Sequence, residues 1–287
     1  MRFSLRRLII ASVAISVLQS GVAQAYRGWY SGVDLLFLSP KLNAVGFNNI
    51  FYHGSDYSQP SDGTTNSNLN FAQRVYIGYE GENLGGVQVR WFTYDQETNY
   101  IGSGADSGGL NPIDGNLNFD VDYIDAELTQ TGQFRVWDWR ATAGVRYARV
   151  DVREDGSNEF EWEDFDDAVW FGLAGVNFEG AGPTLSVRGS REVIWEGFSL
   201  FGSARTSILF GDTELSSIYE IGGGPILIEN DCAQVWELQF GFQHVHQFDA
   251  CDLVSGFFWE AQRWDSDSRL LGGFALHGFG VQTGVQY

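Results

Sequence analysis

Apolar and polar residues alternate along ten segments of the chain. Because successive side chains of a strand face opposite sides, this period of two predicts β-strands. We expect strands at about 28–38, 72–80, 86–96, 117–129, 136–150, 168–191, 198–211, 233–247, 253–264 and 273–287. The segment 168–191 is the least regular, because Pro183 within it cannot donate to a ladder. It is either one bent strand or two strands, so about ten strands are expected and twelve is the alternative count.

The connections between these segments differ in length in a regular way. The tight ones are 81–85, 130–135, 192–197 and 248–252. The long ones are 39–71, 97–116, 151–167, 212–232 and the shorter 265–272. Tight and long connections alternate along the chain, as in outer-membrane barrels, which have short periplasmic turns and long extracellular loops. The pattern therefore predicts an all-β fold, a transmembrane up-and-down antiparallel β-barrel.

The two faces of each predicted strand differ in chemistry. In 136–150, apolar residues such as Trp137 alternate with polar ones such as Arg140 and Arg146. The polar faces of the strands carry many Gly, Ser, Gln and Arg residues but few other long charged side chains, which favours a lumen over a free surface. Tryptophans near most strand ends, Trp264 among them, are typical of the aromatic girdles at the two membrane surfaces.

The last nine residues alternate strictly and end on an aromatic residue. We expect this segment to be the closing strand, paired with the first strand so that the sheet has no open edge. Its apolar face is expected to be the assembly signal that the barrel assembly machinery reads. That face consists of Phe279, Val281, Val285 and Tyr287, with Thr283 between them.

The first 25 residues have the features of a secretory signal peptide. A basic stretch with Arg2, Arg6 and Arg7 precedes a short apolar run, and a small-x-small pattern ends at Ala25. The apolar run is too short for a membrane-spanning helix, which needs about 20 residues. We therefore expect cleavage near Ala25, a mature barrel of residues 26–287, and a final location among the lipids of the outer membrane of a diderm bacterium.

The formal net charge of −20 bears on which partners the protein can bind. So acidic a chain repels nucleic acid, and no nucleic-acid partner is expected. The segment 151–167 is rich in Asp and Glu, and carboxylate oxygens suit divalent cations such as Ca²⁺. The spacing of a known calcium loop is missing, so a solvated acidic loop is the favoured interpretation and a cation site the alternative. No cofactor is expected.

Two histidines and two cysteines are candidates for a metal site and a disulfide. His244 and His246 share the apolar face of 233–247, which favours a position at the membrane interface over a metal site. Cys232 and Cys251 fall at opposite ends of that strand, farther apart than the 7 Å limit between Cα atoms that a disulfide allows. They are therefore predicted not to pair. No catalytic or metal-binding residues are expected.

Several stretches of the chain resemble the Legionella-type major outer membrane protein family of pore-forming barrels. The matching stretches are 143–148, 180–185, 198–202, 207–211, 235–241 and 256–264. They cover the second half of the mature chain well and the first half poorly. The resemblance implies a pore-forming barrel and offers no catalytic residues to carry over. Tyr287 departs from the phenylalanine that is commoner at the end of such barrels, but keeps an aromatic residue there.

Charged residues on the polar faces are the candidates for lining a pore. They are Asp34, Arg74, Arg90, Asp125, Glu127, Arg140, Arg146, Arg188, Arg205, Glu237 and Glu260. Opposed basic and acidic ladders would set up a transverse field that favours polar solutes. The alternative is that these side chains form ion pairs that fill the interior. Eight strands enclose only enough room for side chains, so ten strands lie close to that packed limit.

The expected function is porin-like passage of small hydrophilic solutes without an enzymatic reaction. The first alternative is a closed structural or adhesive barrel whose long loops bind a partner. An outer-membrane barrel enzyme is the second alternative, and no residue pattern requires it. The sequence leaves the transported solute, the width of the lumen and the oligomeric state open.

Overall fold

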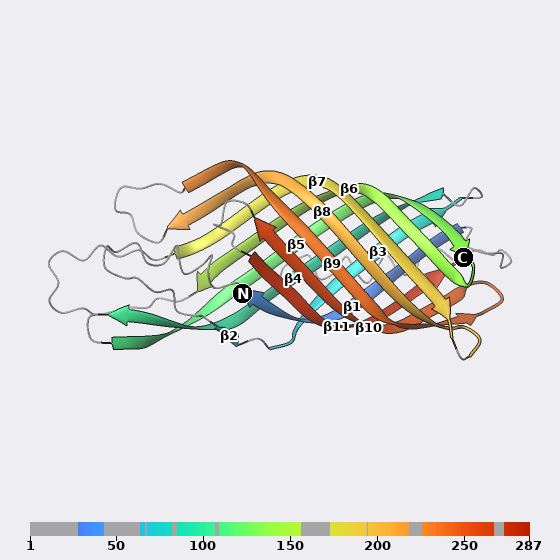
Figure 1. The fold of residues 1–287 in the computed structure, drawn as a ribbon, viewed down its shortest axis with the longest axis horizontal. Helices are drawn as coiled ribbons and strands as arrows, with labels where there is room; N and C mark the ends of the chain where they lie inside the picture. The colour runs from blue at the N-terminus through green and yellow to red at the C-terminus, as the bar shows by residue number, and fades with distance from the viewer. Residues whose placement is uncertain are drawn as a thin grey trace.

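The computed structural model describes residues 28–42, 64–66, 68–81, 85–106, 109–155, 173–193, 195–217, 226–266 and 273–287. Ten of the strands in these ranges form a closed antiparallel barrel, which confirms the predicted fold class (Figure 1). None of the described residues belongs to a helix long and apolar enough to cross a membrane. The predicted signal peptide and its cleavage site lie outside the described residues.

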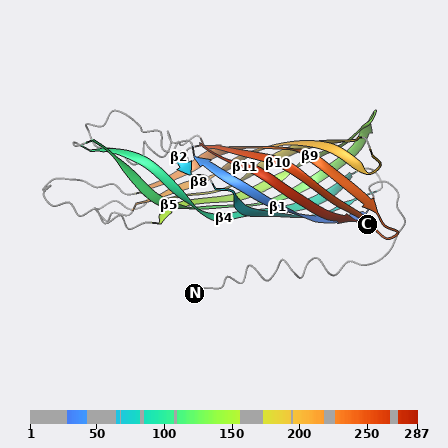
Figure 2. The same ribbon diagram turned by 90° about the horizontal axis from the view of Figure 1, so that it is seen from below.

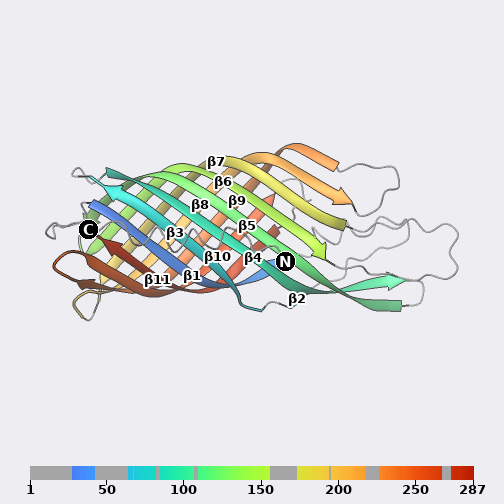
Figure 3. The ribbon, with the colours of Figure 1, turned by 180° about the vertical axis from the view of Figure 1, so that it is seen from behind.

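The strands follow one another around the wall in chain order, and β4 pairs with β5 to close the ring. The strands are β1 (Gly28–Leu42), β2 (Thr64–Asn66), β3 (Asn70–Glu80), β4 (Gly85–Asp106), β5 (Gly109–Phe134), β6 (Trp137–Asp155), β7 (Leu173–Glu192), β8 (Phe198–Ser217), β9 (Ile226–Gln247), β10 (Asp252–Ser266) and β11 (Gly273–Gln286). The view from behind shows the strands crossing the wall at a slant, as barrel closure requires (Figure 3).

The irregular segment around Pro183 belongs to one continuous strand, β7. Pro183 lies opposite Val145 of β6. On the β8 side, the cross-strand pairs stop at Ala181 and resume at Thr184, so the ladder skips the residue without an N–H donor. Ten barrel strands, and not twelve, are therefore the count.

The prediction of a loop at 97–116 was wrong. The ladder between β4 and β5 continues through this segment as far as the pair of Asp106 with Gly109. The three-residue strand β2 pairs with the extension at Asn99 to Ile101 of β4. Figure 2 shows this hairpin reaching beyond the ends of the other strands. The segment is rich in glycine, serine and asparagine, a composition typical of loops. Its backbone nevertheless pairs as a two-stranded β-ribbon.

The first and last strands meet at a seam, as predicted. β1 and β11 pair from Tyr30 opposite Gln286 to Leu42 opposite Phe274. β11 ends at Gln286, but the Tyr287 N–H still donates to the Trp29 carbonyl oxygen at 2.9 Å. Gly28 has a φ of 137°, and a Cβ at this position would lie 2.1 Å from the Tyr287 carbonyl oxygen, so only glycine fits there.

The outer wall is apolar. Large hydrophobic side chains are exposed on every barrel strand, including Phe37, Ile77, Val145 and Phe240. In water so extensive an apolar surface would be a liability, whereas in a bilayer it faces lipid. One predicted member of the aromatic girdles is misplaced: Trp264 points inward and is fully buried.

Candidate functional site

The interior of the barrel is divided into three tiers along its axis, and they are the candidate functional site. Nearest the periplasm is the vestibule, whose residues are half-buried: Tyr76, Arg140, Ser186, Arg188, Ser203 and Gln243. Next comes the charge tier, which is buried: Asp34, Arg74, Arg90, Asp125, Glu127, Arg146, Arg205, Glu237 and Glu260. The apolar tier lies toward the extracellular side and is buried: Leu36, Leu38, Ala72, Phe92, Tyr94, Phe119, Val121, Tyr123, Ala148, Val150, Val152, Val176, Phe178, Leu209, Ala233, Val235, Trp264, Phe274 and Leu276.

All eleven charged residues that the sequence singled out lie inside the barrel. Nine make up the charge tier, and Arg140 and Arg188 belong to the vestibule. Alternation places them there, because each occupies the inward face of its strand. Their position is therefore as expected, whereas a role in lining a pore stays a prediction.

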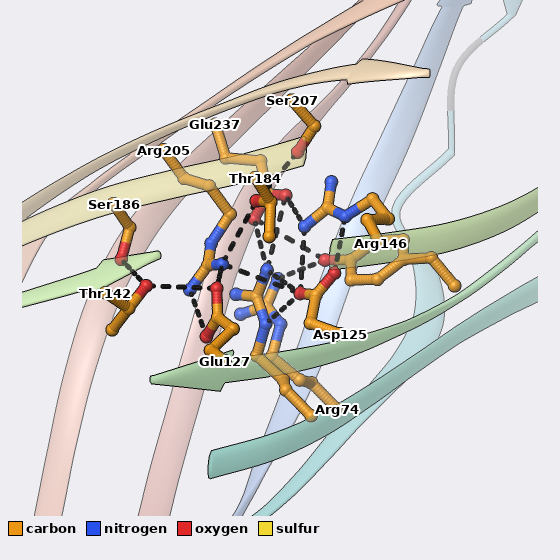
Figure 4. Close-up of polar contacts among 12 residues, drawn as sticks. Arg74, Asp125, Glu127, Thr142, Arg146, Thr184, Ser186, Arg205, Ser207 and Glu237 are labelled. Atoms are coloured by element: carbon orange, nitrogen blue, oxygen red, sulfur yellow. Dashed lines mark hydrogen bonds and ion pairs between the residues drawn. The ribbon is translucent and has the colours of Figure 1, made fainter. Parts of the chain in front are cut away.

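The centre of the charge tier is a cluster around Asp125 (Figure 4). Arg146 donates to both of its carboxylate oxygens, at 2.7 and 3.0 Å, and the Arg90 Nε donates to one of them at 2.8 Å. Arg90 and Arg146 also form ion pairs with Glu237. Because β4 and β9 stand opposite each other in the ring, the contact between Arg90 and Glu237 crosses the whole lumen.

Two further ion-pair groups complete this tier. Arg74 donates to Asp34 at 3.1 Å and to Glu260 at 3.0 Å. Arg205 forms an ion pair with Glu127, which also accepts a hydrogen bond from the Thr142 hydroxyl at 3.0 Å. The contacts of Arg74 with Glu260 and of Arg205 with Glu127 join strands that are three places apart in the ring, whereas the other two join neighbouring strands. The interior is thus bridged by side chains from several directions.

The charges are interleaved around the ring. Basic residues on β3 and β4 are followed by acidic ones on β5, basic ones on β6 and β8, and acidic ones on β9, β10 and β1. Of the two arrangements that the sequence left open, opposed ladders and ion pairs, the side chains adopt the ion pairs. Burial favours them, because a buried charge is costly unless an opposite charge lies beside it.

The apolar tier, which was not predicted from the sequence, is held together by aromatic rings. Phe92 stacks on Tyr123 with 4.7 Å between ring centroids, and Trp264 stacks on Phe274 at 5.6 Å. The rings of Tyr123 and Trp264 lie 6.3 Å apart, although β5 and β10 stand opposite each other in the ring. A sequence signal existed in the unbroken apolar run 35–38, because both faces of a strand are apolar there.

Tyr123 lies at the boundary of the two buried tiers. One face of its ring is covered by the Arg146 guanidinium, 4.0 Å from the ring centroid. Its hydroxyl lies 3.5 Å from Glu237 and accepts from Arg74 at 3.4 Å. The hydroxyl thus contacts the charge tier and the ring packs in the apolar tier, so Tyr123 connects the two tiers.

The vestibule is polar and leads inward from the periplasmic end. Arg140 forms an ion pair with buried Glu80 and lies over the ring of Tyr30, 4.7 Å from its centroid. Arg188 donates to Gln243 at 2.6 Å and covers the ring of Phe201 at 3.9 Å. Partial exposure of these side chains contrasts with the burial of the two tiers beyond them.

The outer wall carries an acidic row above the apolar belt, on the extracellular side. Asp120 lies opposite Asp95 on one neighbouring strand and Asp151 on the other. Burial, together with the charges of Asp122, Asp95 and Asp151, raises the pKa of Asp120 to about 6. Asp151 is paired with Arg149 and Arg153. In contrast to the interior, this row brings like charges together.

The other candidate sites gain no support as reactive centres. Most of the acidic segment 151–167 lies outside the described residues, so the predicted cation site there stays a prediction. No group of three or more metal-ligating side chains occurs among the residues that the structure does describe. His244 and His246 are exposed on β9, with 6.3 Å between ring centroids. Cys232 and Cys251 are not joined by a disulfide, as the layout predicted.

The chain is similar to solved structures of outer-membrane barrels. The outer membrane protease OmpT of Escherichia coli has a TM-score of 0.51 and 12% identity, over 93% of this chain and 98% of that one. The translocator domain of the Neisseria meningitidis autotransporter NalP has a TM-score of 0.39 and 9% identity, over 98% and 93%. The toluene transporter TbuX of Ralstonia pickettii has a TM-score of 0.35 and 9% identity, over 90% and 89%. At these identities, the likeness to the protease concerns the fold alone.

Sequence comparison defines the family. No curated protein matches the chain. The family model described as Legionella pneumophila major outer membrane protein precursor matches residues 22–235. The match covers the first half of the chain as well, which corrects the impression that the resemblance lies mainly in the second half. The chain therefore belongs to the Legionella major outer membrane protein family of outer-membrane β-barrels.

Proposed function

We propose that this protein is a closed structural or adhesive barrel, which anchors its extracellular parts in the outer membrane for contact with a partner. The observation that carries the proposal is that side chains from opposite walls touch at two levels of the lumen. Arg90 meets Glu237 in the charge tier, and Tyr123 meets Trp264 in the apolar tier. Both contacts join opposite walls of the barrel.

Burial of the interior side chains supports a closed lumen. A water-filled pore would leave its lining residues exposed to solvent, as in open porins of 16–18 strands. Here no residue of the charge tier is more than 8% exposed, and none of the apolar tier is more than 2% exposed. The interior is thus packed like a protein core.

On the extracellular side, β4 and β5 extend far enough beyond the membrane to present a binding surface. A strand crosses the membrane with about 9–11 residues, whereas β4 and β5 have 22 and 26. Their hairpin stands beyond the neighbouring strands and carries β2 on one side. Such a ribbon, continuous with the barrel wall, is a candidate surface for contact with a partner.

Conductance of the purified protein in planar lipid bilayers tests the proposal. We expect no ion current above that of protein-free bilayers, over a range of voltages and salt concentrations. The inserted barrel is verified by its heat-modifiable mobility in gels. Stable single-channel steps would contradict a closed barrel and favour the second candidate.

The second candidate is porin-like passage of small hydrophilic solutes. The half-exposed vestibule favours it, because polar side chains there continue inward through Tyr30, Gln88 and Glu127 by hydrogen bonds of 2.9 and 3.4 Å. Both buried tiers would have to part for a solute to pass. Swelling of protein-containing vesicles in solutions of small sugars measures such passage directly. Neither candidate assigns the protein an enzymatic activity.

Insertion by the barrel assembly machinery is part of the same proposal. Phe279 and Val281 of β11 are exposed on the outer wall at the seam with β1, and half-buried Val285 and, directly after the strand, Tyr287 continue this alternation. Deletion of Thr283–Tyr287 is expected to abolish membrane assembly, because it removes the end of the closing strand. A truncated chain that still enters the outer-membrane fraction as a heat-modifiable barrel would argue against this signal.

A further inference from the structure

Six buried side-chain atoms in the described part of the chain have no hydrogen-bond partner. They are Asp34 Oδ1, Arg74 Nε, Glu80 Oε1 and Oε2, Thr129 Oγ1 and Arg146 Nη1. Glu80 Oε1 lies in an ion pair with Arg140, so Oε2 is the Glu80 atom without a polar partner. All five residues lie in the charge tier or on its periplasmic side.

Unsatisfied polar atoms of this kind are rare in folded proteins, because each one forfeits the hydrogen bonds that it would make with water. Buried water molecules are the usual remedy, and they occupy sites with several polar neighbours. The charge tier offers such neighbours at each of its three orphaned atoms. The half-exposed vestibule provides the route by which water reaches them from the periplasm.

The apolar tier offers water nothing comparable. None of the six orphaned atoms belongs to it. Its two tyrosine hydroxyls lie at its borders: the Tyr123 hydroxyl faces Glu237 and Arg74, and the Tyr94 hydroxyl accepts from Asn70 at 3.4 Å. Between these borders, stacked rings and aliphatic side chains fill the lumen. Apolar constrictions exclude ions because water does not wet them.

We infer that water enters the barrel from the periplasm and fills the gaps of the charge tier, and that the apolar tier is the seal that stops water and ions. This inference rests on the proposed closed barrel and identifies the part that closes it. The charge tier is then a wetted layer that crosses the lumen without sealing it. The aromatic contacts around Trp264 form the barrier.

Hydroxyl-radical footprinting of the unaltered protein, with radicals generated from water by an X-ray pulse, tests where water lies. We expect oxidation of Tyr76 in the vestibule and of Tyr123 at the border of the charge tier. Trp264 should remain unmodified, although tryptophan is highly reactive, and exposed Trp195 in a periplasmic turn serves as the positive control. Oxidation of Trp264 as fast as that of Tyr123 would overturn the inference, and so would complete protection of Tyr123.

Two double variants test the seal. Phe92→Gly with Trp264→Gly widens the apolar tier, whereas Arg205→Ser with Glu127→Ser widens the charge tier and keeps its charge balance. In planar bilayers, we expect ion current only from the apolar-tier variant, provided that both variants are heat-modifiable barrels. A folded apolar-tier variant that stays silent, or a charge-tier variant that conducts, would overturn the inference.

The two proposals fail in different ways. Current through the unaltered protein would contradict the closed barrel itself. Silence of the unaltered protein, combined with the wrong labelling pattern or the wrong conducting variant, would contradict only the position of the seal. The footprinting result does not depend on whether the glycine variants fold.

Discussion

The charge tier and the apolar tier fill the same lumen by different physics. The charge tier depends on direction and balance, because each guanidinium must meet carboxylates in suitable geometry to offset the cost of leaving water. The apolar tier depends on volume, because its rings must fill the space between opposite walls. On each strand that carries a charge-tier residue, the boundary lies within one or two inward positions, as from Arg90 to Phe92 on β4. A barrel wall of uniform geometry thus supports two kinds of core.

The largest effect is expected where the balance of the charge tier is broken on one side only. Arg146→Met leaves the buried carboxylates of Asp125 and Glu237 short of a partner, and we expect a loss of about 3–5 kcal/mol in the free energy of unfolding. Urea unfolding of the barrel in lipid vesicles measures it. Arg153→Met on the same strand is the control, since its exposed ion pair is worth less than about 1 kcal/mol. Similar losses in both variants would contradict the importance of balance.

Removing volume from the apolar tier is expected to have an effect of nearly the same size. Trp264→Ala opens a cavity among stacked rings and should lower the free energy of unfolding by about 3–4 kcal/mol. Trp236→Ala on the lipid-facing side of β9 is the matched control, because lipid chains can fill the space that it leaves. If the two losses were equal, the interior of the apolar tier would not be tightly packed.

Removing both members of an ion pair separates the effect of charge balance from the effect of the charges themselves. Arg205→Met together with Glu127→Met deletes two opposite charges that face each other. We expect a loss of about 1 kcal/mol, well below that of Arg205→Met alone, because no uncompensated charge remains. A double-mutant cycle from urea unfolding gives the coupling. A double variant as unstable as the single one would show that the charges themselves are required.

The smallest effect is expected on the outer wall, where like charges meet. Because the pKa of Asp120 is raised to about 6, its carboxylate is ionised above pH 6, and this ionised form destabilises the folded state. Asp120→Asn should therefore stabilise the barrel slightly at pH 8, by less than about 1 kcal/mol because the site is partly exposed. The gain should vanish below about pH 4, where the carboxyl is protonated in both the folded and unfolded states. A stabilisation that is independent of pH would contradict repulsion as its cause.

Much of the fold follows from local sequence pattern. Alternation alone gave the ten barrel strands and the inward side of every charged residue in the charge tier, because the direction of a side chain in a strand depends only on its position. The seam between β1 and β11 followed from the need to close the sheet edge. These features require no knowledge of which residues meet across the lumen.

The parts that were missed depend on distant contacts. Whether Arg90 meets Glu237 is set by the slant and register of all ten strands, which local alternation does not encode. The apolar tier was hidden because in 35–38 an inward apolar face lies beside an outward one, so alternation disappears. Trp264 looked like a girdle residue because it lies at the predicted end of its strand. The hairpin of β4 and β5 was missed because its ladder overrides a composition typical of loops.

The seam between β1 and β11 forms late in folding. β1 finds one of its two partners, β3, soon after it in the chain, but the other, β11, is the last strand. Contacts between such distant segments form late, because a long loop must close before they gain anything. One edge of β1 therefore stays unpaired until β11, the last strand, is available. A chaperone or assembly factor that shields this edge would protect the protein from aggregation at its most vulnerable stage.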